Sequence, residues 1–281
     1  MAMKSNQLTA FVFAALIGQL LAVAPIAHAA LPPDEKEAKS TLEKSPRHGE
    51  FIDIPVPNAK TPLKSYIVYP ERKDKATVVI VIHEIFGLSD WVRSVADQLA
   101  ADGFIAIAPD MLCGHGKDGG GTDSFASRDD VVAAIRGLKS DEVIADLNAV
   151  RDYGIKLPAA SAKSATIGFC WGGGKSFDYA AHQPGLDAAI VYYGTPPSKE
   201  TLANIKAPVM GNYGGTDARV TSTVEPTEAS MKELGKSYAP HVYEGAGHGF
   251  LRQQDGQNGA NLKAAQEAWP ATLEFLRQYT K

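Results

Sequence analysis

The 281-residue chain has the composition of a globular protein, with 44% hydrophobic and 21% charged residues. This apolar content is enough for one large core, and no linker interrupts the predicted elements, so we expect one folded domain. The 28 basic and 32 acidic residues give a formal net charge of −4. No basic stripe is visible, which argues against nucleic acid and anionic membrane surfaces as partners.

Residues 1–29 have the pattern of a signal peptide. Lys4 precedes an apolar run from Leu8 to Ile26, and Ala27-His28-Ala29 forms a cleavage site of the small-x-small type. An uncleaved membrane anchor is the alternative, because the run could nearly span a bilayer. Pro25 and the Ala-His-Ala site favour cleavage. We therefore expect a periplasmic or secreted mature protein without membrane contact.

The charged, proline-containing residues 30–48 predict a flexible N-terminal arm before a domain at 49–281. Alternating residues at 51–56 and 63–69 predict two strands that form an antiparallel edge of a sheet. The uninterrupted apolar run at 76–82 predicts a strand buried on both faces.

Helices and strands then alternate to the end of the chain. Asp90 is the expected cap of the first helix. Further strands are expected at 104–108, 165–169, 188–193, 208–213 and 241–243, with helices at 90–100, 140–150, 173–182, 225–235 and along the C-terminus. This alternation predicts an α/β fold with a mostly parallel sheet and helices on both faces. In such sheets reactive groups gather at the carboxyl ends of the strands.

Gly168-Phe169-Cys170-Trp171-Gly172 follows a predicted strand and opens a predicted helix. This is the context of a nucleophile elbow, with Cys in place of Ser. The sharp turn requires small flanking residues, and the helix N-terminus favours a thiolate. A buried structural cysteine is the alternative. A disulfide with Cys113 would consume the thiolate, so we expect Cys170 to be free.

A nucleophile needs a base and an orienting acid, which follow it in the order acid, base in this fold. Asp217 and His248 each come directly after a predicted strand, in that order, among glycines that permit tight turns. Taken singly, Asp217 could be a turn residue and His248 a surface histidine. His83 ends a buried strand and is expected to be structural. No spacing resembles a zinc site, and we expect no metal or cofactor.

With these residues in view, the chain resembles the dienelactone hydrolase family. His83–Leu88 is similar to the family's oxyanion-side loop, Gly168–Gly173 to its nucleophile motif and Gly245–Phe250 to its histidine motif. The resemblance covers about residues 50 to 280. It implies the α/β-hydrolase fold and a triad of Cys170, Asp217 and His248 that cleaves an ester or lactone through a thioester.

The resemblance also implies roles for five further residues. Glu84 would pair with the resting thiol and help to activate it, and the backbone N–H groups of Ile85 and Trp171 would form the oxyanion hole. Arg128 and Arg252 would hold a substrate carboxylate, for which a guanidinium is well suited. Without the family resemblance, the alternative for Glu84 is a strand-end carboxylate in a surface salt bridge. The alternative for Arg128 is a solvated residue at the start of a helix.

Two features depart from the family pattern. The glycine-rich segment Cys113–Ser124 is expected near the pocket mouth, which leaves the choice of substrate open, and the well-known members carry no leader. We expect a monomer acting on a small-molecule ester or lactone of the dienelactone type. A broad-specificity carboxylesterase and a non-catalytic secreted binding protein of the same fold are the alternatives.

Overall fold

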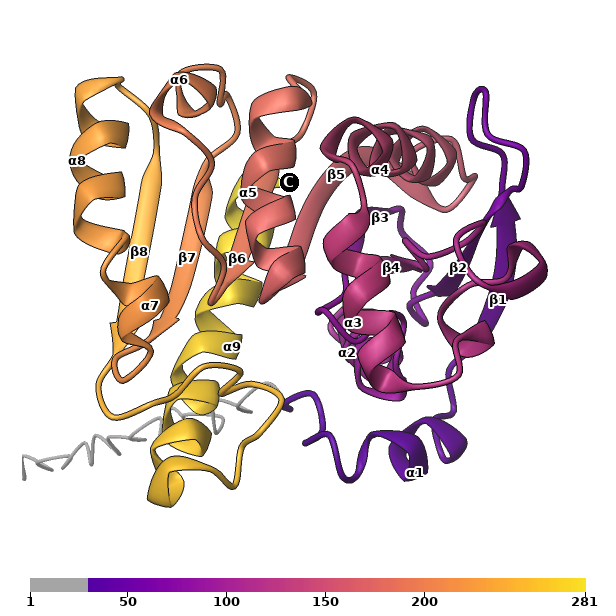
Figure 1. Ribbon diagram of the computed structural model, residues 1–281, viewed down its shortest axis with the longest axis horizontal. Helices are drawn as coiled ribbons and strands as arrows, with labels where there is room; N and C mark the ends of the chain where they lie inside the picture. Colours follow the sequence, from indigo (N-terminus) through magenta and orange to yellow (C-terminus); the bar gives the residue numbers. More distant parts are fainter. Residues whose placement is uncertain (1–29) are drawn as a thin grey trace, which may run out of the picture.

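A computed structural model describes residues 30–281, and the predicted signal peptide at residues 1–29 lies outside them. The centre of the molecule is one eight-stranded sheet in the order β1-β2-β4-β3-β5-β6-β7-β8 (Figure 1). The strand bounds are β1 (Gly49–Ile54), β2 (Leu63–Val68), β3 (Ala76–Ile82), β4 (Ile105–Pro109), β5 (Ala160–Phe169), β6 (Ala188–Tyr192), β7 (Val209–Gly214) and β8 (Tyr238–Tyr243).

The two ends of the sheet differ in strand direction. β2 pairs antiparallel with β1 and β4, whereas all pairs from β4 through β3, β5, β6 and β7 to β8 are parallel. The predicted antiparallel edge and the predicted mostly parallel α/β sheet are both confirmed. Because the parallel strands share one direction, their carboxyl ends lie along one edge of the sheet.

The α-helices within residues 30–281 are α1 (Ala38–Glu43), α2 (Asp90–Ala101), α3 (Arg128–Gly137), α4 (Ser140–Gly154), α5 (Trp171–His182), α6 (Lys199–Leu202), α7 (Ala218–Thr221), α8 (Val224–Glu233) and α9 (Ala260–Tyr279). None of these described helices combines the length and the apolar character that a membrane crossing requires.

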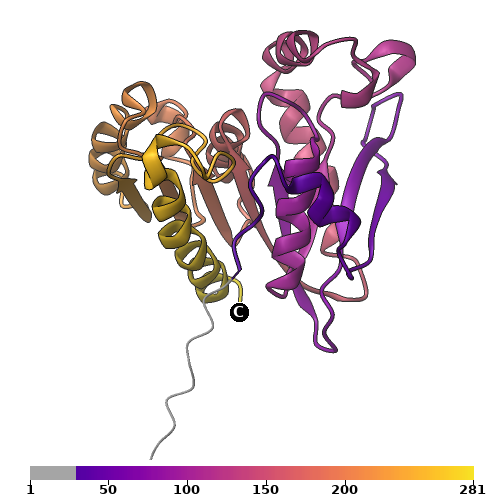
Figure 2. The same ribbon diagram turned by 90° about the horizontal axis from the view of Figure 1, so that it is seen from below.

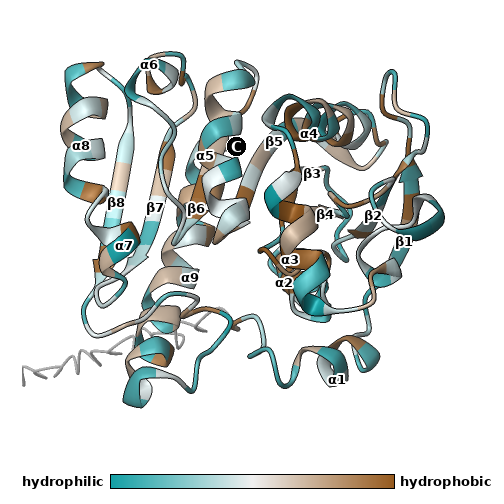
Figure 3. Cartoon of the chain, viewed as in Figure 1, coloured by the Kyte–Doolittle hydropathy of each residue, from teal (hydrophilic) through white to brown (hydrophobic). Residues whose placement is uncertain are grey.

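The core lies in two layers, one on each face of the sheet. Val79 and Val81 of β3 pack with apolar residues of α2 and α9. Val78, Ile80 and Ile82 point to the other face and pack with residues of α4, α5 and α8. Successive strand side chains point to opposite faces, so a strand covered on both sides must be apolar throughout. Figure 3 shows the result, with β6 mainly hydrophobic and the peripheral α1 mainly hydrophilic.

Some element boundaries differ from the sequence-based expectation. Ser89, not Asp90, caps α2, because its side chain accepts a hydrogen bond from the Val92 N–H. β5 starts at Ala160 instead of residue 165. The short helices α6 and α7 were not expected, since four residues are too few to show a helical period.

The segment 30–48, expected to be a flexible arm, is instead packed against the domain. Arg47 forms an ion pair with the buried Asp97 of α2, with its Nε 3.0 Å from Oδ1. The indole N–H of Trp91 donates to the Pro33 carbonyl at 3.1 Å. Figures 1 and 2 show the indigo chain passing from beside α9 to α2. Polar partners on the domain hold this segment together with apolar burial, since Ala38 is fully buried in the core and Leu31 packs against it. Composition alone does not reveal these contacts.

Candidate active site

Cys170 lies in the tight turn between β5 and α5. Its φ of 54° and ψ of −113° are strained for a non-glycine residue, and its N–H donates to the Tyr192 carbonyl at 3.0 Å. A Cβ on Gly168 would lie 1.9 Å from the Gly172 carbonyl oxygen, and one on Gly172 would lie 2.3 Å from the Ile82 carbonyl oxygen. The turn can therefore form only with glycine on both sides of the cysteine, as a nucleophile elbow requires.

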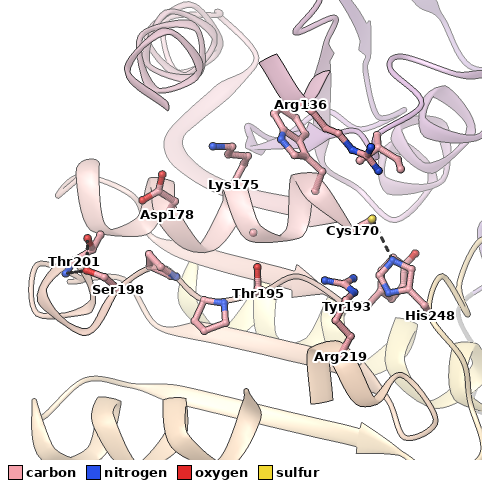
Figure 4. Close-up of a pocket in the computed structure, with 15 residues that line it drawn as sticks. Arg136, Cys170, Lys175, Asp178, Tyr193, Thr195, Ser198, Thr201, Arg219 and His248 are labelled. Atoms are coloured by element: carbon pink, nitrogen blue, oxygen red, sulfur yellow. Dashed lines mark hydrogen bonds between the residues drawn. The ribbon is translucent and has the colours of Figure 1, made fainter. Parts of the chain in front are cut away.

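Asp217 and His248 meet Cys170 at the carboxyl edge of the sheet. The Nε2 atom of His248 is 3.1 Å from the sulfur, and its Nδ1 is 2.5 Å from Oδ2 of Asp217. Asp217 lies between β7 and α7, and His248 lies in the loop after β8. Figure 4 shows the imidazole directed at the sulfur. The three side chains that the sequence proposed as a unit thus form one hydrogen-bonded chain.

The thiol of Cys170 is protonated at neutral pH in this state. Burial raises the pKa of the thiol to about 11, and the negative charge of Glu84 acts in the same direction. The backbone N–H of Trp171 lowers the pKa, which is the helix-terminus effect expected from the sequence. That effect is outweighed by burial and by the charge of Glu84.

Glu84 is buried two residues beyond the end of β3, with only 2% of its surface exposed. Its Oε2 forms an ion pair with Nε of Arg252 at 2.6 Å. The N–H is not directed at that oxygen, so neither carboxylate oxygen accepts a hydrogen bond within residues 30–281. Burial raises the pKa of Glu84 to about 7, although Arg252 lowers it. The alternative of a surface salt bridge is therefore wrong.

The two residues expected to supply the oxyanion hole, Ile85 and Trp171, line the same cleft as the Cys170 sulfur. Trp171 is the first residue of α5, where N–H groups have no partner within the helix. In the described part of the chain neither amide donates to a backbone carbonyl. Neither amide is therefore committed to a backbone partner among these residues, and the Trp171 N–H already points to the reacting sulfur.

Arg128 and Arg252 lie together, as the family resemblance implied. Their guanidinium carbons are 3.6 and 5.2 Å from the centre of the Phe86 ring. Both face a carboxylate of the protein itself, because Arg252 forms an ion pair with Glu35, whose other oxygen lies 3.8 Å from Nη2 of Arg128. We refer to Glu35, Glu84, Arg128 and Arg252 as the arginine cluster.

A cleft of about 860 Å³ opens over the sulfur. Its lining residues are Ile85, Arg136, Cys170, Trp171, Gly174, Lys175, Asp178, Tyr193, Thr195, Pro196, Pro197, Ser198, Thr201, Arg219 and His248. Figure 4 shows these side chains between α5 and the segment that follows β6. Three cations and one carboxylate give the cleft an excess of positive charge. Arg128 and Arg252 are not among its lining residues.

The glycine-rich segment Cys113–Ser124 was expected at the pocket mouth, but none of its residues lines the cleft. It folds back on the loop after β3, where Thr122 Oγ1 accepts from the Leu88 N–H at 3.0 Å and donates to Asp110 at 2.7 Å. A Cβ on Gly87 would lie 2.3 Å from the same oxygen. The segment therefore packs against the oxyanion-side loop and holds it through Thr122.

His83 and Cys113 have structural positions. Nδ1 of the buried His83 is 2.8 Å from the Glu84 carbonyl oxygen, and its Nε2 accepts from the Met111 N–H at 3.2 Å. Cys113 accepts from the Lys64 N–H at 3.2 Å, and burial raises the pKa of its thiol to about 11. Both cysteines are free. In the described residues no group of three or more His, Cys, Asp or Glu side chains could hold a metal ion.

Three residues at the site were missed by sequence reasoning. Tyr193 directly follows β6, has a φ of 41°, and places its ring 5.1 Å from the imidazole of His248. Arg219 of α7 lines the cleft. Glu35 reaches the arginine cluster from the N-terminal arm. The position of Tyr193 at a strand end was a usable signal, whereas nothing in the sequence distinguishes Glu35 from its charged neighbours.

Fold and relatives together define a hydrolase of the α/β-hydrolase fold that acts on ester or lactone bonds. The sequence pattern of the dienelactone hydrolase family matches residues 63–280, so the chain belongs to that family. A protein of Salmonella typhimurium strain LT2, provisionally named a carboxymethylenebutenolidase, is 31% identical over 240 residues, which are 80% of this chain and 86% of the relative.

Two further comparisons agree. The carboxymethylenebutenolidase of Pseudomonas sp. strain P51 is 30% identical over 221 residues, covering 76% of this chain and 89% of the relative. The crystal structure of a provisionally named dienelactone hydrolase from Klebsiella pneumoniae superposes with a TM-score of 0.73 and 27% identity, covering 83% of this chain and 99% of that one. A non-catalytic binding protein is therefore set aside in favour of an enzyme.

Proposed function

We propose that the protein hydrolyses esters or lactones through a covalent thioester on Cys170, with His248 as the base and Asp217 as the acid that orients it. The observation that carries the proposal is the unbroken chain from the Asp217 carboxylate through the imidazole to the sulfur. This is the arrangement that acyl transfer by an activated nucleophile requires.

In the first half-reaction the Cys170 sulfur attacks the substrate carbonyl carbon while its proton passes to Nε2 of His248. Asp217 stabilises the resulting imidazolium through Nδ1. The carbonyl oxygen becomes an oxyanion between the amides of Ile85 and Trp171. The intermediate collapses with cleavage of the ester C–O bond, and the leaving oxygen takes the proton from His248. For a lactone the leaving group stays attached as an alcohol or enol.

In the second half-reaction His248 removes a proton from a water molecule, which attacks the thioester carbonyl. Cleavage of the C–S bond releases the acid, and the proton on His248 returns to the sulfur. Glu84 is proposed to assist the first ionisation of Cys170. Its pKa of about 7 lets it exchange a proton near neutral pH. Its negative charge raises the pKa of the resting thiol, so the assistance requires Glu84 to act as a proton acceptor when substrate binds.

The test is Cys170→Ala, with Cys113→Ala as the matched control that removes the other thiol. Turnover of p-nitrophenyl acetate and of dienelactone should disappear in Cys170→Ala and persist in the control. Mass spectrometry of acid-quenched wild type should show an acyl adduct on Cys170. Turnover by a folded Cys170→Ala protein would remove the sulfur from the mechanism.

A broad-specificity carboxylesterase is the second candidate, and a specific observation favours it. The two arginines expected to bind a substrate carboxylate already contact Glu35 and Glu84. Arg128→Ala and Arg252→Ala separate the two candidates. A raised KM for an anionic lactone in both variants supports a dienelactone-type substrate, and an unchanged KM supports the broader esterase.

We also propose that residues 1–29 are removed as a signal peptide and that the mature, monomeric enzyme works in the periplasm or outside the cell. The small-x-small site at Ala27-His28-Ala29 supports cleavage after Ala29. Intact mass and light scattering of protein from the periplasmic fraction test both points. A mass that includes residues 1–29 would contradict cleavage.

A further inference from the structure

We infer that Glu35 is a specificity-determining residue that fills the carboxylate-binding position of the arginine cluster and so keeps substrate carboxylates out of it. The inference rests on the proposed function and refines it. It predicts that the enzyme with Glu35 in place favours an uncharged ester or lactone over the corresponding acid at this position.

The geometry of Glu35 is that of a ligand shared by two arginines. One carboxylate oxygen contacts Nη1 of Arg252, and the other lies 3.8 Å from Nη2 of Arg128. The Arg128 guanidinium stacks on Phe86 at 3.6 Å, which fixes its orientation. Two guanidinium groups held around one aromatic ring form a site for a single carboxylate, and Glu35 supplies that carboxylate from within the chain.

Above the Glu84 pKa of about 7, the charges of the arginine cluster balance only when Glu35 is present. Two arginines face two glutamates, and Glu84 is buried beside Arg252 with no hydrogen bond to its oxygens in the described chain. A substrate carboxylate would add a third negative charge next to Glu84. Without the Glu35 charge the cluster carries one excess positive charge and can accept a substrate carboxylate in its place.

The arm is held at Glu35 and just before it by contacts that do not involve the Glu35 carboxylate. The Glu35 N–H donates to the Arg252 carbonyl at 3.0 Å. The preceding residue, Asp34, accepts from the Gln254 N–H at 2.8 Å, and the side chain of Gln254 donates to the Pro32 carbonyl at 2.8 Å. Replacement of the carboxylate by an amide therefore removes the charge and leaves the arm in place.

The experiment compares kcat/KM for dienelactone and for its methyl ester, which differ only in the carboxylate. In Glu35→Gln the ratio of acid to methyl ester should rise on the order of tenfold, because a charge-assisted contact to arginine becomes available. The matched control is Glu37→Gln, which removes an exposed charge of the same arm that has no ion-pair partner within residues 30–281. The cations of the cleft are present in every variant, so their effect on the acid-to-ester ratio cancels when a variant is compared with wild type.

Two further readouts make the result specific. The gain should appear in KM, shrink as ionic strength rises and vanish in Glu35→Gln/Arg128→Ala. An unchanged ratio in a folded Glu35→Gln protein, or an equal rise in Glu37→Gln, overturns the inference. Failure of the proposed function has a different signature, because wild type would then turn over neither substrate or Cys170→Ala would remain active.

Discussion

The triad and the arginine cluster lie at the same edge of the sheet, but they differ in whether their charged groups are paired within the protein. In the triad, the Asp217 carboxylate is satisfied by an imidazole whose second nitrogen contacts the thiol, so the chain of contacts ends in the open cleft. In the arginine cluster, each guanidinium faces a carboxylate of the protein. The first arrangement leaves the sulfur open to substrate, whereas in the second each guanidinium is already paired with a carboxylate of the protein.

This difference separates the chemistry of the enzyme from its choice of substrate. The triad needs only a carbonyl group beside the sulfur. We propose that the arginine cluster adds selectivity through the charge of the substrate, and that this selectivity depends on which carboxylate occupies the cluster. The following variants act on one region, on the other, or on the link between them.

The largest effect is expected at the reactive end of the triad. His248→Ala removes the group that accepts the Cys170 proton, and kcat/KM for p-nitrophenyl acetate should fall by about 10²–10⁴-fold. His115→Ala, in the exposed part of the glycine-rich segment, is the control and should leave turnover as in wild type. Steady-state kinetics give both values, and a loss of less than tenfold in His248→Ala would contradict its role as the base.

The turn that holds the sulfur should be the next most sensitive point. A Cβ at residue 168 meets the Gly172 carbonyl oxygen at 1.9 Å, so Gly168→Ala should lower the free energy of unfolding by about 3 kcal/mol or more. Gly137→Ala is the matched control, because nothing lies within 4 Å of its added Cβ at the end of α3. Urea unfolding of both variants measures the difference, and equal stabilities would show that the turn relaxes freely.

In the arginine cluster, Glu84 should make stability depend on pH. The native pKa of about 7 exceeds the ordinary value of 4.5, so the native state binds a proton more tightly than the unfolded state. This contribution is fully present below pH 4.5 and is lost as pH rises to 7, by on the order of 3 kcal/mol. Urea unfolding at pH 5 and pH 7.5 should therefore show a smaller fall for Glu84→Gln than for wild type. Equal falls would contradict the raised pKa.

The smallest effect should appear where the two regions meet. The charge of Glu84 raises the pKa of the Cys170 thiol, so Glu84→Gln should increase the rate of alkylation by iodoacetamide several-fold at pH 8, above the Glu84 pKa of about 7. A Cys113→Ala background restricts the reaction to one thiol. Alkylation that becomes slower in the variant would show that Glu84 promotes ionisation even without substrate.

The sequence was sufficient to predict that Cys170, Asp217 and His248 lie together, for a physical reason. A strand end followed by glycines places Cys170, Asp217 and His248 each in a tight turn, and parallel strands bring these turns to one edge. The antiparallel start of the sheet was equally predictable from alternating residues at 51–56 and 63–69. Local pattern and topology together determine where these side chains lie.

Other features depend on contacts that no local pattern records. Glu35 meets Arg252 across 217 positions of the chain, and its surroundings are uniformly charged. The glycine-rich segment was expected at the cleft because of its composition, yet the hydrogen bond between Thr122 and Leu88 holds it against the loop after β3. The helix N-terminus correctly predicted one influence on the Cys170 thiol, but the depth of burial that outweighs it is a property of the folded molecule.

The resting state of the sulfur also affects how the enzyme withstands oxidants. Hydrogen peroxide attacks thiolates, and a thiol whose pKa is about 11 is almost entirely protonated at neutral pH. Resting Cys170 is therefore protected from conversion to sulfenic acid. The same burial that keeps the thiol protonated therefore slows its oxidation.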